Sequence, residues 1–372
     1  MLLLFLWGDF MSIYIHIPFC DSICSYCDFC KVFYNSKLVD DYLKSLSKEI
    51  DMYYKGETID TIYIGGGTPS CLNLEQLSVL FNILKKFNYN DKYEFTFECN
   101  IENIDYDKLK FLYDNGVNRL SIGVQTFNEK FLNFLNRNHK CSDVIEKISI
   151  AKEIGFDNIN IDLIYAIPGE TIDDLNYDID RFLELGINHI STYSLILEEH
   201  TKLYVDGVFN IDEELDRKMY DLICDRLVRN GYEHYEISNF GKSGYLSCHN
   251  LVYWNNNHYY GFGCGASGYI DDIRYDNTRS LNKYIDGNYR FDSEALDRNT
   301  ILENEFILGL RKIKGINISD FNKKYGNIFY DVVNRLISDG KLINDGKSIF
   351  INPDYIYVSN SILVEFLGED YK

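Results

Sequence analysis

The sequence is short of basic residues, since 37 lysines and arginines stand against 57 aspartates and glutamates and leave a formal net charge of −20. Such a charge repels phosphate backbones and anionic lipid, so we expect no nucleic-acid partner. The chain also lacks an apolar run of the roughly 20 residues that a membrane-spanning helix needs. Residues 1–10 are apolar, but they lack the basic start and small-residue cleavage site of a signal peptide. We therefore expect a cytoplasmic protein without stable membrane insertion.

The composition is otherwise ordinary for a globular protein, with 46% hydrophobic and 25% charged residues among 372. From residue 12 to residue 197, short strand-like runs alternate with segments whose apolar residues recur every three or four positions. This alternation predicts βα units that share a parallel sheet, and six units predict an α/β fold with a partial (β/α)6 barrel of the TIM type. The expected strands are residues 13–17, 61–64, 93–97, 119–124, 159–165 and 189–195, and the expected helices are residues 38–54, 74–87, 106–115, 142–154 and 172–185.

The same patterns divide the chain into four regions. Residues 1–11 form an N-terminal extension, in which Met11 is a second candidate initiator, and residues 12–240 form the partial barrel. Residues 241–290 are rich in glycine and aromatic residues, and the part up to residue 270 is expected to consist mostly of loops. Residues 291–372 predict a small winged-helix-like α+β module, for which the acidic charge favours a structural or substrate-covering role over DNA binding. Its expected helices are residues 303–312, 318–324 and 329–339, and its expected hairpin is residues 341–352.

Four of the ten cysteines lie close together after the first expected strand. Cys20, Cys24 and Cys27 have the spacing C-x3-C-x2-C, and three thiolates so close in sequence indicate a site for zinc, copper(I) or an iron–sulfur cluster. Three ligands on a four-iron cluster would leave one iron open to a substrate or cofactor. Cys30 offers a fourth thiolate, so a closed zinc or electron-transfer site is the alternative. A long chain without a secretory signal favours metal binding in a reducing compartment over disulfides.

Polar and glycine-rich motifs follow the expected strands at one end. The second strand runs into the glycines of residues 65–69, the third ends at Glu98, the fourth ends near Gln125, and the fifth carries Asp162. The carboxyl ends of barrel strands build the active site in this class of fold. We therefore expect these residues to meet the cysteine run at one mouth of the barrel.

The residues from Tyr14 to Cys27 read Y-x-H-I-P-F-C-x3-C-x-Y-C, which resembles the signature of the radical S-adenosylmethionine (SAM) superfamily. More narrowly, the order of the motifs resembles the oxygen-independent coproporphyrinogen oxidase-like branch. The resemblance extends over nearly the whole chain from residue 12. Its further motifs are residues 65–69, 98–100, 121–127, 137–139 and 162–169.

The resemblance implies that Cys20, Cys24 and Cys27 hold a [4Fe–4S] cluster, whose fourth iron is chelated by the amino and carboxylate groups of SAM. Glycines would let the backbone approach the methionine amino group, and the planar fork of Arg137 suits the carboxylate. The implied chemistry is one-electron cleavage of SAM to methionine and a 5′-deoxyadenosyl radical, and no residue is assigned as catalytic. The residues that the resemblance assigns to SAM are Tyr14, Tyr26, Gly66, Gly67, Thr68, Glu98, Gln125, Arg137 and Asp162.

Two features distinguish the members of this branch. The oxidases carry a further cysteine two positions after the third cluster cysteine, whereas this chain has Phe29 there, as the haem chaperones of the branch do. The segment H-N-L-V-Y-W, from His249 to Trp254, resembles their proposed haem-binding motif. A histidine can ligate haem iron, and the rings of Tyr253 and Trp254 can cover the macrocycle. From residue types alone, a buried histidine with satisfied hydrogen bonds is the alternative. Nearby alternative ligands are Cys248 and Cys264.

The resemblance therefore implies a haem chaperone that binds a [4Fe–4S] cluster, SAM and haem, and that passes haem to haem-requiring proteins such as those of the respiratory chain. An electron donor is a second expected partner. The alternative is an oxygen-independent coproporphyrinogen III oxidase, which decarboxylates propionate side chains in porphyrin biosynthesis. A third hypothesis is an electron carrier whose closed cluster uses Cys30 as its fourth ligand.

Overall fold

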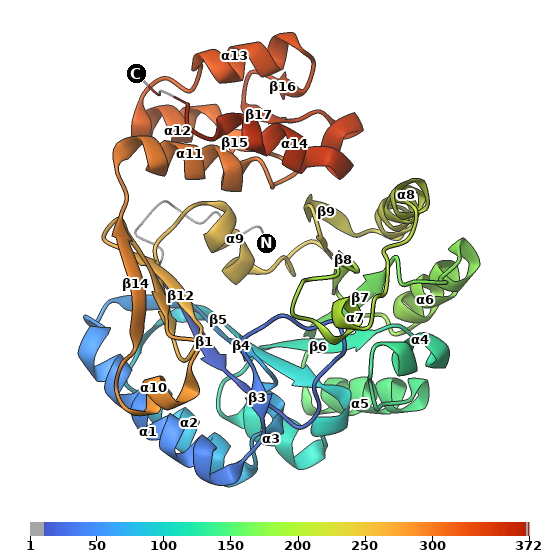
Figure 1. Ribbon diagram of the computed structural model, residues 1–372, viewed down its shortest axis with the longest axis vertical. Coiled ribbons are helices and arrows are strands. Elements are labelled where there is room, and N and C mark those ends of the chain that lie inside the picture. The colour runs from blue at the N-terminus through green and yellow to red at the C-terminus, as the bar shows by residue number, and fades with distance from the viewer. Residues whose placement is uncertain (1–10, 370, 372) are drawn as a thin grey trace.

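The computed structural model describes residues 11–369 and 371 (Figure 1). Its main feature is a curved sheet whose central seven strands run parallel to their neighbours. The central strands are, in sheet order, β11 (Tyr259–Phe262), β1 (Ser12–Ile17), β4 (Thr58–Gly66), β5 (Asn88–Asn100), β6 (Arg119–Gln125), β7 (Asn158–Tyr165) and β8 (His189–Ser194). Antiparallel strands extend one edge with β12 (Ser267–Ile270), β13 (Ile273–Asn277) and β14 (Arg290–Ala295), and the other with β10 (Asn239–Gly241) and β9 (Glu233–Glu236).

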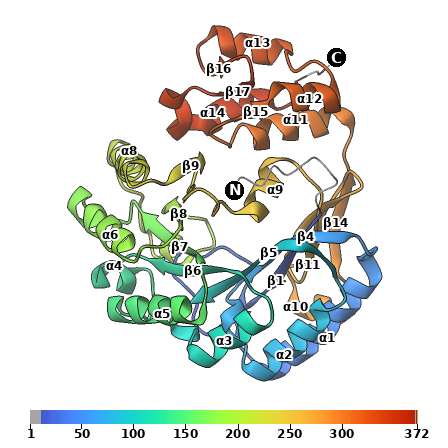
Figure 2. The same ribbon diagram turned by 180° about the vertical axis from the view of Figure 1, so that it is seen from behind.

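The predicted fold class is confirmed. The six expected strands correspond to β1 and β4–β8, and the edge strands β14 and β9 are not paired with each other in the described part of the chain, so the barrel is partial. Helices line the outer, convex side of the sheet in both views (Figures 1 and 2). These are α1 (Ser36–Tyr53), α2 (Leu74–Leu84), α3 (Tyr106–Asp114), α4 (Glu129–Phe134), α5 (Cys141–Ile154), α6 (Ile172–Glu184) and α8 (Glu213–Arg229).

Local sequence explains where these helices start and which face they bury. The Asn73 side chain accepts a hydrogen bond from the Gln76 backbone and the Gln76 side chain accepts one from the Asn73 backbone, a capping box that starts α2. Thr171 and Asp174 form the same arrangement at the start of α6. Apolar side chains at intervals of three and four along each helix are buried against the sheet. No helix among the described residues is both long enough and apolar enough to cross a bilayer.

The prediction that residues 241–270 consist mostly of loops is wrong. They contain α9 (Cys248–Trp254), β11 and β12, and β11 pairs with β1 in parallel, with Tyr14 opposite Gly261. Glycines conceal the strand pattern, since a Cβ on Gly261 would lie 1.8 Å from the Ser267 carbonyl oxygen. The close approach of the two backbones requires glycine there, and a strand with glycine in its interior loses its usual sequence signal.

A C-terminal module covers the open side of the sheet, above α9 in Figure 1. It contains the three expected helices, the expected hairpin and a further helix near the C-terminus, and its core stacks Phe306 on Phe366 with 4.9 Å between ring centroids. It meets the edge of the sheet where the Ile313 backbone N–H donates to the Tyr235 carbonyl at 3.1 Å. Its elements are α11 (Arg298–Gly309), β15 (Ile316–Asn317), α12 (Ile318–Tyr325), α13 (Asp331–Ser338), β16 (Leu342–Asn344), β17 (Ser348–Ile351) and α14 (Ser359–Leu363).

Candidate functional site

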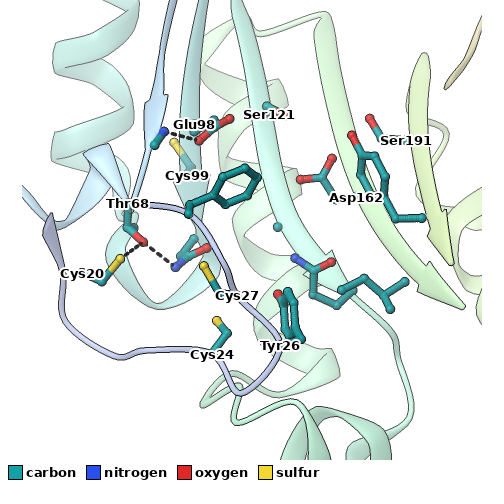
Figure 3. Close-up of a pocket in the computed structure, with 18 of the residues that line it drawn as sticks. Cys20, Cys24, Tyr26, Cys27, Thr68, Glu98, Cys99, Ser121, Asp162 and Ser191 are labelled. Atoms are coloured by element: carbon teal, nitrogen blue, oxygen red, sulfur yellow. Dashed lines mark hydrogen bonds between the residues drawn. The ribbon is translucent and has the colours of Figure 1, made fainter. Parts of the chain in front are cut away.

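One cavity of about 370 Å³ lies at the carboxyl ends of the parallel strands (Figure 3). The cysteine run lies on one side of it, and Asp162 and Ser191 lie across it. Its lining brings together eleven of the residues singled out in the sequence: Cys20, Cys24, Tyr26, Cys27, Gly66, Gly67, Thr68, Glu98, Gln125, Arg137 and Asp162. The cavity lining does not include Tyr14, His249, Tyr253 or Trp254.

Cys20 ends β2 (Phe19–Cys20), and Cys24 and Cys27 lie on the loop that leads to β3 (Val32–Phe33). Hydrogen-bond donors lie beside two of the three thiols. The Thr68 hydroxyl donates to Cys20 Sγ at 3.4 Å, and Arg137 Nη1 donates to Cys24 Sγ at 3.5 Å. Burial raises the pKa of Cys20 to about 11. A bound metal must therefore displace the Cys20 proton, and the two donors are placed to stabilise thiolates. Within residues 11–369 and 371, no three His, Cys, Asp or Glu side chains are arranged to hold a single metal ion.

Two other cysteines near the loop differ from these three. Cys99 lines the cavity at the end of β5, but burial raises its pKa to about 12 and favours the protonated thiol. Cys30 lies outside the cavity lining, with its Sγ 3.9 Å from Cys264 Sγ. The closed-cluster hypothesis needs Cys30 Sγ to face the other cluster cysteines, whereas here it contacts Cys264 Sγ and the Arg279 carbonyl.

The wall opposite the loop carries two half-buried carboxyl groups, those of Glu98 and Asp162. Glu98 Oε2 accepts from the Gly66 backbone N–H at 3.0 Å, and Oε1 accepts from the Tyr63 hydroxyl at 2.7 Å. Burial raises the pKa of Glu98 to about 7, and burial also raises the pKa of Asp162. Gln125 has a φ of 75°, a left-handed conformation that is costly for glutamine, and its side chain lines the cavity at the end of β6.

Arg137 spans two strand ends from the loop after α4. Its Nη2 donates to the Gly123 carbonyl at 2.7 Å, and both terminal nitrogens lie 3.1 Å from Asn100 Oδ1. The side chain is almost fully buried, and its Nε finds no hydrogen-bond partner among the described residues. Nη1 also donates to Cys24 Sγ, and Nη2 lies 3.5 Å from Glu102 Oε2. The planar guanidinium can therefore hold a carboxylate ligand by exchanging one of these acceptors for it.

The sequence reasoning did not assign Arg119, Asn160, Ser191 or Tyr63 to the site, although all four line the cavity. A signal for most of them exists, because alternate residues of a strand share one face. On β6, residues 119, 121, 123 and 125 all line the cavity, and on β7 residues 160, 162 and 164 do so. Polar residues at every second position of otherwise apolar strands would have identified this inner face.

Tyr14 is not part of the cavity lining. Its hydroxyl lies 3.0 Å from His16 Nδ1, and its ring centroid is 6.1 Å from that of Tyr63, which does line the cavity. Tyr26, by contrast, lines the cavity beside Cys24 (Figure 3).

His249, on α9, is 1% exposed, and both of its ring nitrogens have partners inside the protein. Nδ1 lies 2.7 Å from Thr61 Oγ1, whose own hydrogen goes to Ser12, so Nδ1 carries the proton. Nε2 then accepts from the Tyr253 hydroxyl at 2.8 Å. Burial lowers the pKa of His249 to about 3, so the ring is neutral. This matches the alternative of a buried, satisfied histidine.

The rest of α9 joins the sheet to the C-terminal module. The backbone N–H groups of Cys248 and His249 each donate to the Glu94 carboxylate at 2.9 Å, which ties the start of the helix to β5. At the other end, the Arg311 guanidinium lies over the Trp254 ring, 5.6 Å from its centroid. Asn250 is the one residue of the helix that lines the cavity.

Comparisons with known proteins show the family of the chain. The model of the radical SAM superfamily matches residues 14–182. The heme chaperone HemW of Lactococcus lactis is 40% identical, with 96% of this chain and 98% of the relative covered. HemW of Bacillus subtilis is 39% identical over 96% and 99% of the two chains. The solved structure of the coproporphyrinogen III oxidase HemN of Escherichia coli covers 96% of this chain and 90% of that chain with a TM-score of 0.85 at 24% identity, so it supports the fold alone.

Proposed function

The chain belongs to the HemW family of the radical SAM superfamily, and from this premise we propose that it is a cytoplasmic haem chaperone that binds haem and passes it to haem-requiring proteins. The observation that carries the proposal is the 40% identity to a protein named as a heme chaperone over nearly the full length of both chains. The superfamily implies a [4Fe–4S] cluster and SAM. A protein that supplies the electron for SAM cleavage is a further proposed partner.

The thiols of the cysteine run suit the cluster. Cys20, Cys24 and Cys27 face one cavity, and sulfur donors favour iron–sulfur clusters. A Cβ on Gly67 would lie 2.9 Å from Cys20 Sγ, so glycine at this position keeps the space beside that sulfur free. The cluster, once bound, would supply an electron at an iron that this loop leaves without a cysteine ligand.

The cavity wall suits an amino acid joined to a nucleoside. Arg137 would hold the carboxylate of SAM, and Glu98 and Asp162 would accept hydrogen bonds from its amino or ribose hydroxyl groups. Gly66, Thr68 and Gln125 line the same cavity and would complete this wall. Tyr26 would exclude water beside the cluster.

For haem, we propose His249 Nε2 as the axial ligand, in a state in which the Tyr253 hydroxyl has released it. Tyr253 and Trp254 would then lie beside the macrocycle. This requires α9 to loosen from its contacts with β4, because the ring is buried in the described conformation.

Anaerobic reconstitution followed by parallel titration with SAM and haem tests the proposal. We expect haem to bind the cluster-loaded protein and then to transfer to an apo-haem protein. Failure of the cluster-loaded protein to bind haem would overturn it, and formation of protoporphyrinogen from coproporphyrinogen would establish the oxidase instead. The variant Tyr253→Phe removes the hydroxyl that occupies His249 Nε2, so haem binding should persist or strengthen. The variant His249→Ala removes the proposed ligand itself and should abolish haem binding. Equal haem binding by His249→Ala would show that the ligand lies elsewhere.

A further inference from the structure

Cys30 and Cys264 are 234 residues apart in sequence, and their sulfur atoms are 3.9 Å apart. Both thiols are free. Each thiol also donates to a backbone carbonyl in the segment that directly follows β13. Cys264 Sγ donates to the Thr278 carbonyl at 3.1 Å, and Cys30 Sγ donates to the Arg279 carbonyl at 3.5 Å. The two sulfur atoms therefore face each other in a defined position.

The surrounding contacts hold the two backbones close together. A Cβ on Gly265 would lie 2.5 Å from Cys30 Cβ, so only glycine permits this approach. On the other side of Cys30, His16 Nε2 lies 2.7 Å from the Cys30 carbonyl oxygen and Arg279 Nη2 donates to the Asp28 carbonyl at 2.9 Å. The end of the cluster loop is thus docked on the segment that follows β11.

From this geometry we infer that Cys30 and Cys264 form an oxidant-sensitive dithiol, which a low-molecular-weight disulfide converts into a protein disulfide. The Cys30 thiolate attacks one sulfur of the reagent and forms a mixed disulfide, and the other half of the reagent leaves as a thiolate. The Cys264 sulfur then attacks Cys30 Sγ and expels the second half. The two protons of the protein thiols pass to the two leaving thiolates, so one disulfide is reduced for each one formed.

The order of attack follows from exposure and charge. Cys30 is half-buried and can meet a reagent, whereas Cys264 is fully buried. When Cys30 ionises, Cys264 can turn its proton from the Thr278 carbonyl to the Cys30 sulfur. This hydrogen bond lowers the pKa of Cys30 to about 7 against the effect of burial, and the positive charge of Arg279 lowers it further. A thiol that ionises near neutral pH attacks fastest, and the buried partner resolves the intermediate. The resulting bond would tie the loop that carries Cys27 to the outer strands of the sheet.

Oxidised glutathione, added anaerobically to the cluster-loaded protein, tests this inference. After alkylation and digestion, mass spectrometry should find the Cys30 and Cys264 peptides cross-linked, while the cluster absorbance is retained. In Cys264→Ser, Cys30 should instead keep one glutathione, and in Cys30→Ser neither the cross-link nor a glutathione on Cys264 should form. Cys224→Ser is the matched control, because Cys224 is also half-buried but lies beside His234, and it should leave the cross-link unchanged.

Two results would overturn the inference. One is that Cys30 of the wild-type protein is still a free thiol after the glutathione treatment and is therefore alkylated. The other is a disulfide from Cys30 to Cys20, Cys24 or Cys27. Neither depends on haem, so this test can fail while the chaperone proposal stands, and the reverse also holds.

Discussion

The cavity contains the cysteine motif and helix α9 contains the proposed haem-binding motif. The polar atoms of the first are open to a ligand, whereas the histidine of the second is hydrogen-bonded within the protein. In the cavity, the thiols of the cysteine run face open space, and Arg137 Nε finds no protein partner in the described part of the chain. On α9, both ring nitrogens of His249 are bound within the protein, and the N–H groups at the start of the helix are bound by Glu94.

The difference separates a binding site from a structural joint. The thiols that face the cavity can take a soft metal or an iron–sulfur cluster as they stand. The ring nitrogens of His249 are fully paired, and a fully paired polar cluster stabilises the fold that contains it. Elsewhere on α9, the buried Trp254 Nε1 has no hydrogen-bond partner among the described residues.

The largest effect should come from removing one cluster thiol. In Cys24→Ala, we expect the iron–sulfur absorbance after anaerobic reconstitution to fall to background, because the remaining thiols of the run cannot hold the cluster. Cys99→Ala is the matched control, since Cys99 lines the same cavity as a protonated thiol, and it should keep the cluster. Loss of the cluster in Cys30→Ser as well would revive the closed-cluster hypothesis.

In contrast to Cys24→Ala, which should remove the cluster, His249→Ala should lower the free energy of unfolding. We expect the free energy of unfolding to fall by about 3 kcal/mol, because the substitution leaves a cavity and two buried hydroxyl groups without their partner. Urea unfolding of the cluster-free protein measures this. If the variant is as stable as the wild type but its cluster is lost, the contrast between the two regions does not hold.

The sequence predicted the fold well wherever apolar periodicity is strong, as in β4–β8 and the helices between them. It failed at β11, where close packing of backbones demands glycine and removes the apolar pattern. In the site, the cysteine spacing and the strand-end motifs indicated which residues share a cavity. Arg119 and Asn160 escaped because they lie inside strands that were considered only for their apolar content.

For α9 the sequence gives the residue types but not the burial. A histidine near tyrosine and tryptophan is compatible with a haem site and with a packed core, and only tertiary structure shows that Thr61, from a strand 188 residues away in sequence, occupies Nδ1. The pairing of Cys30 with Cys264 is unpredictable for the same reason, because no local pattern relates two residues on separate loops.

A smaller effect should follow from Arg137→Lys. Lysine keeps the charge but loses the planar fork that reaches Gly123 and Asn100 together, so we expect SAM to bind about tenfold more weakly, equivalent to about 1.4 kcal/mol. Equilibrium binding to the cluster-loaded protein measures it. The iron content should be unchanged, and an unchanged affinity for SAM would remove Arg137 from the proposed carboxylate site.

The smallest expected effect is the contribution of His249 to the pH dependence of stability. Burial lowers the pKa of His249 from 6.5 to about 3, so between these values the unfolded chain binds a proton that the folded chain does not. Stability from this residue is therefore complete above pH 6.5 and is lost as the pH falls, by about 1 kcal/mol between pH 7 and pH 5.5. Other buried histidines, including His16 and His234, whose pKa values burial lowers to about 4, add to the slope of the wild type. The measurement is therefore the difference in slope between the wild type and His249→Gln, from urea unfolding at several pH values. Equal slopes would mean that His249 binds protons equally in the folded and the unfolded chain, and it would then not be the neutral, internally paired residue that distinguishes this part of α9 from the cavity.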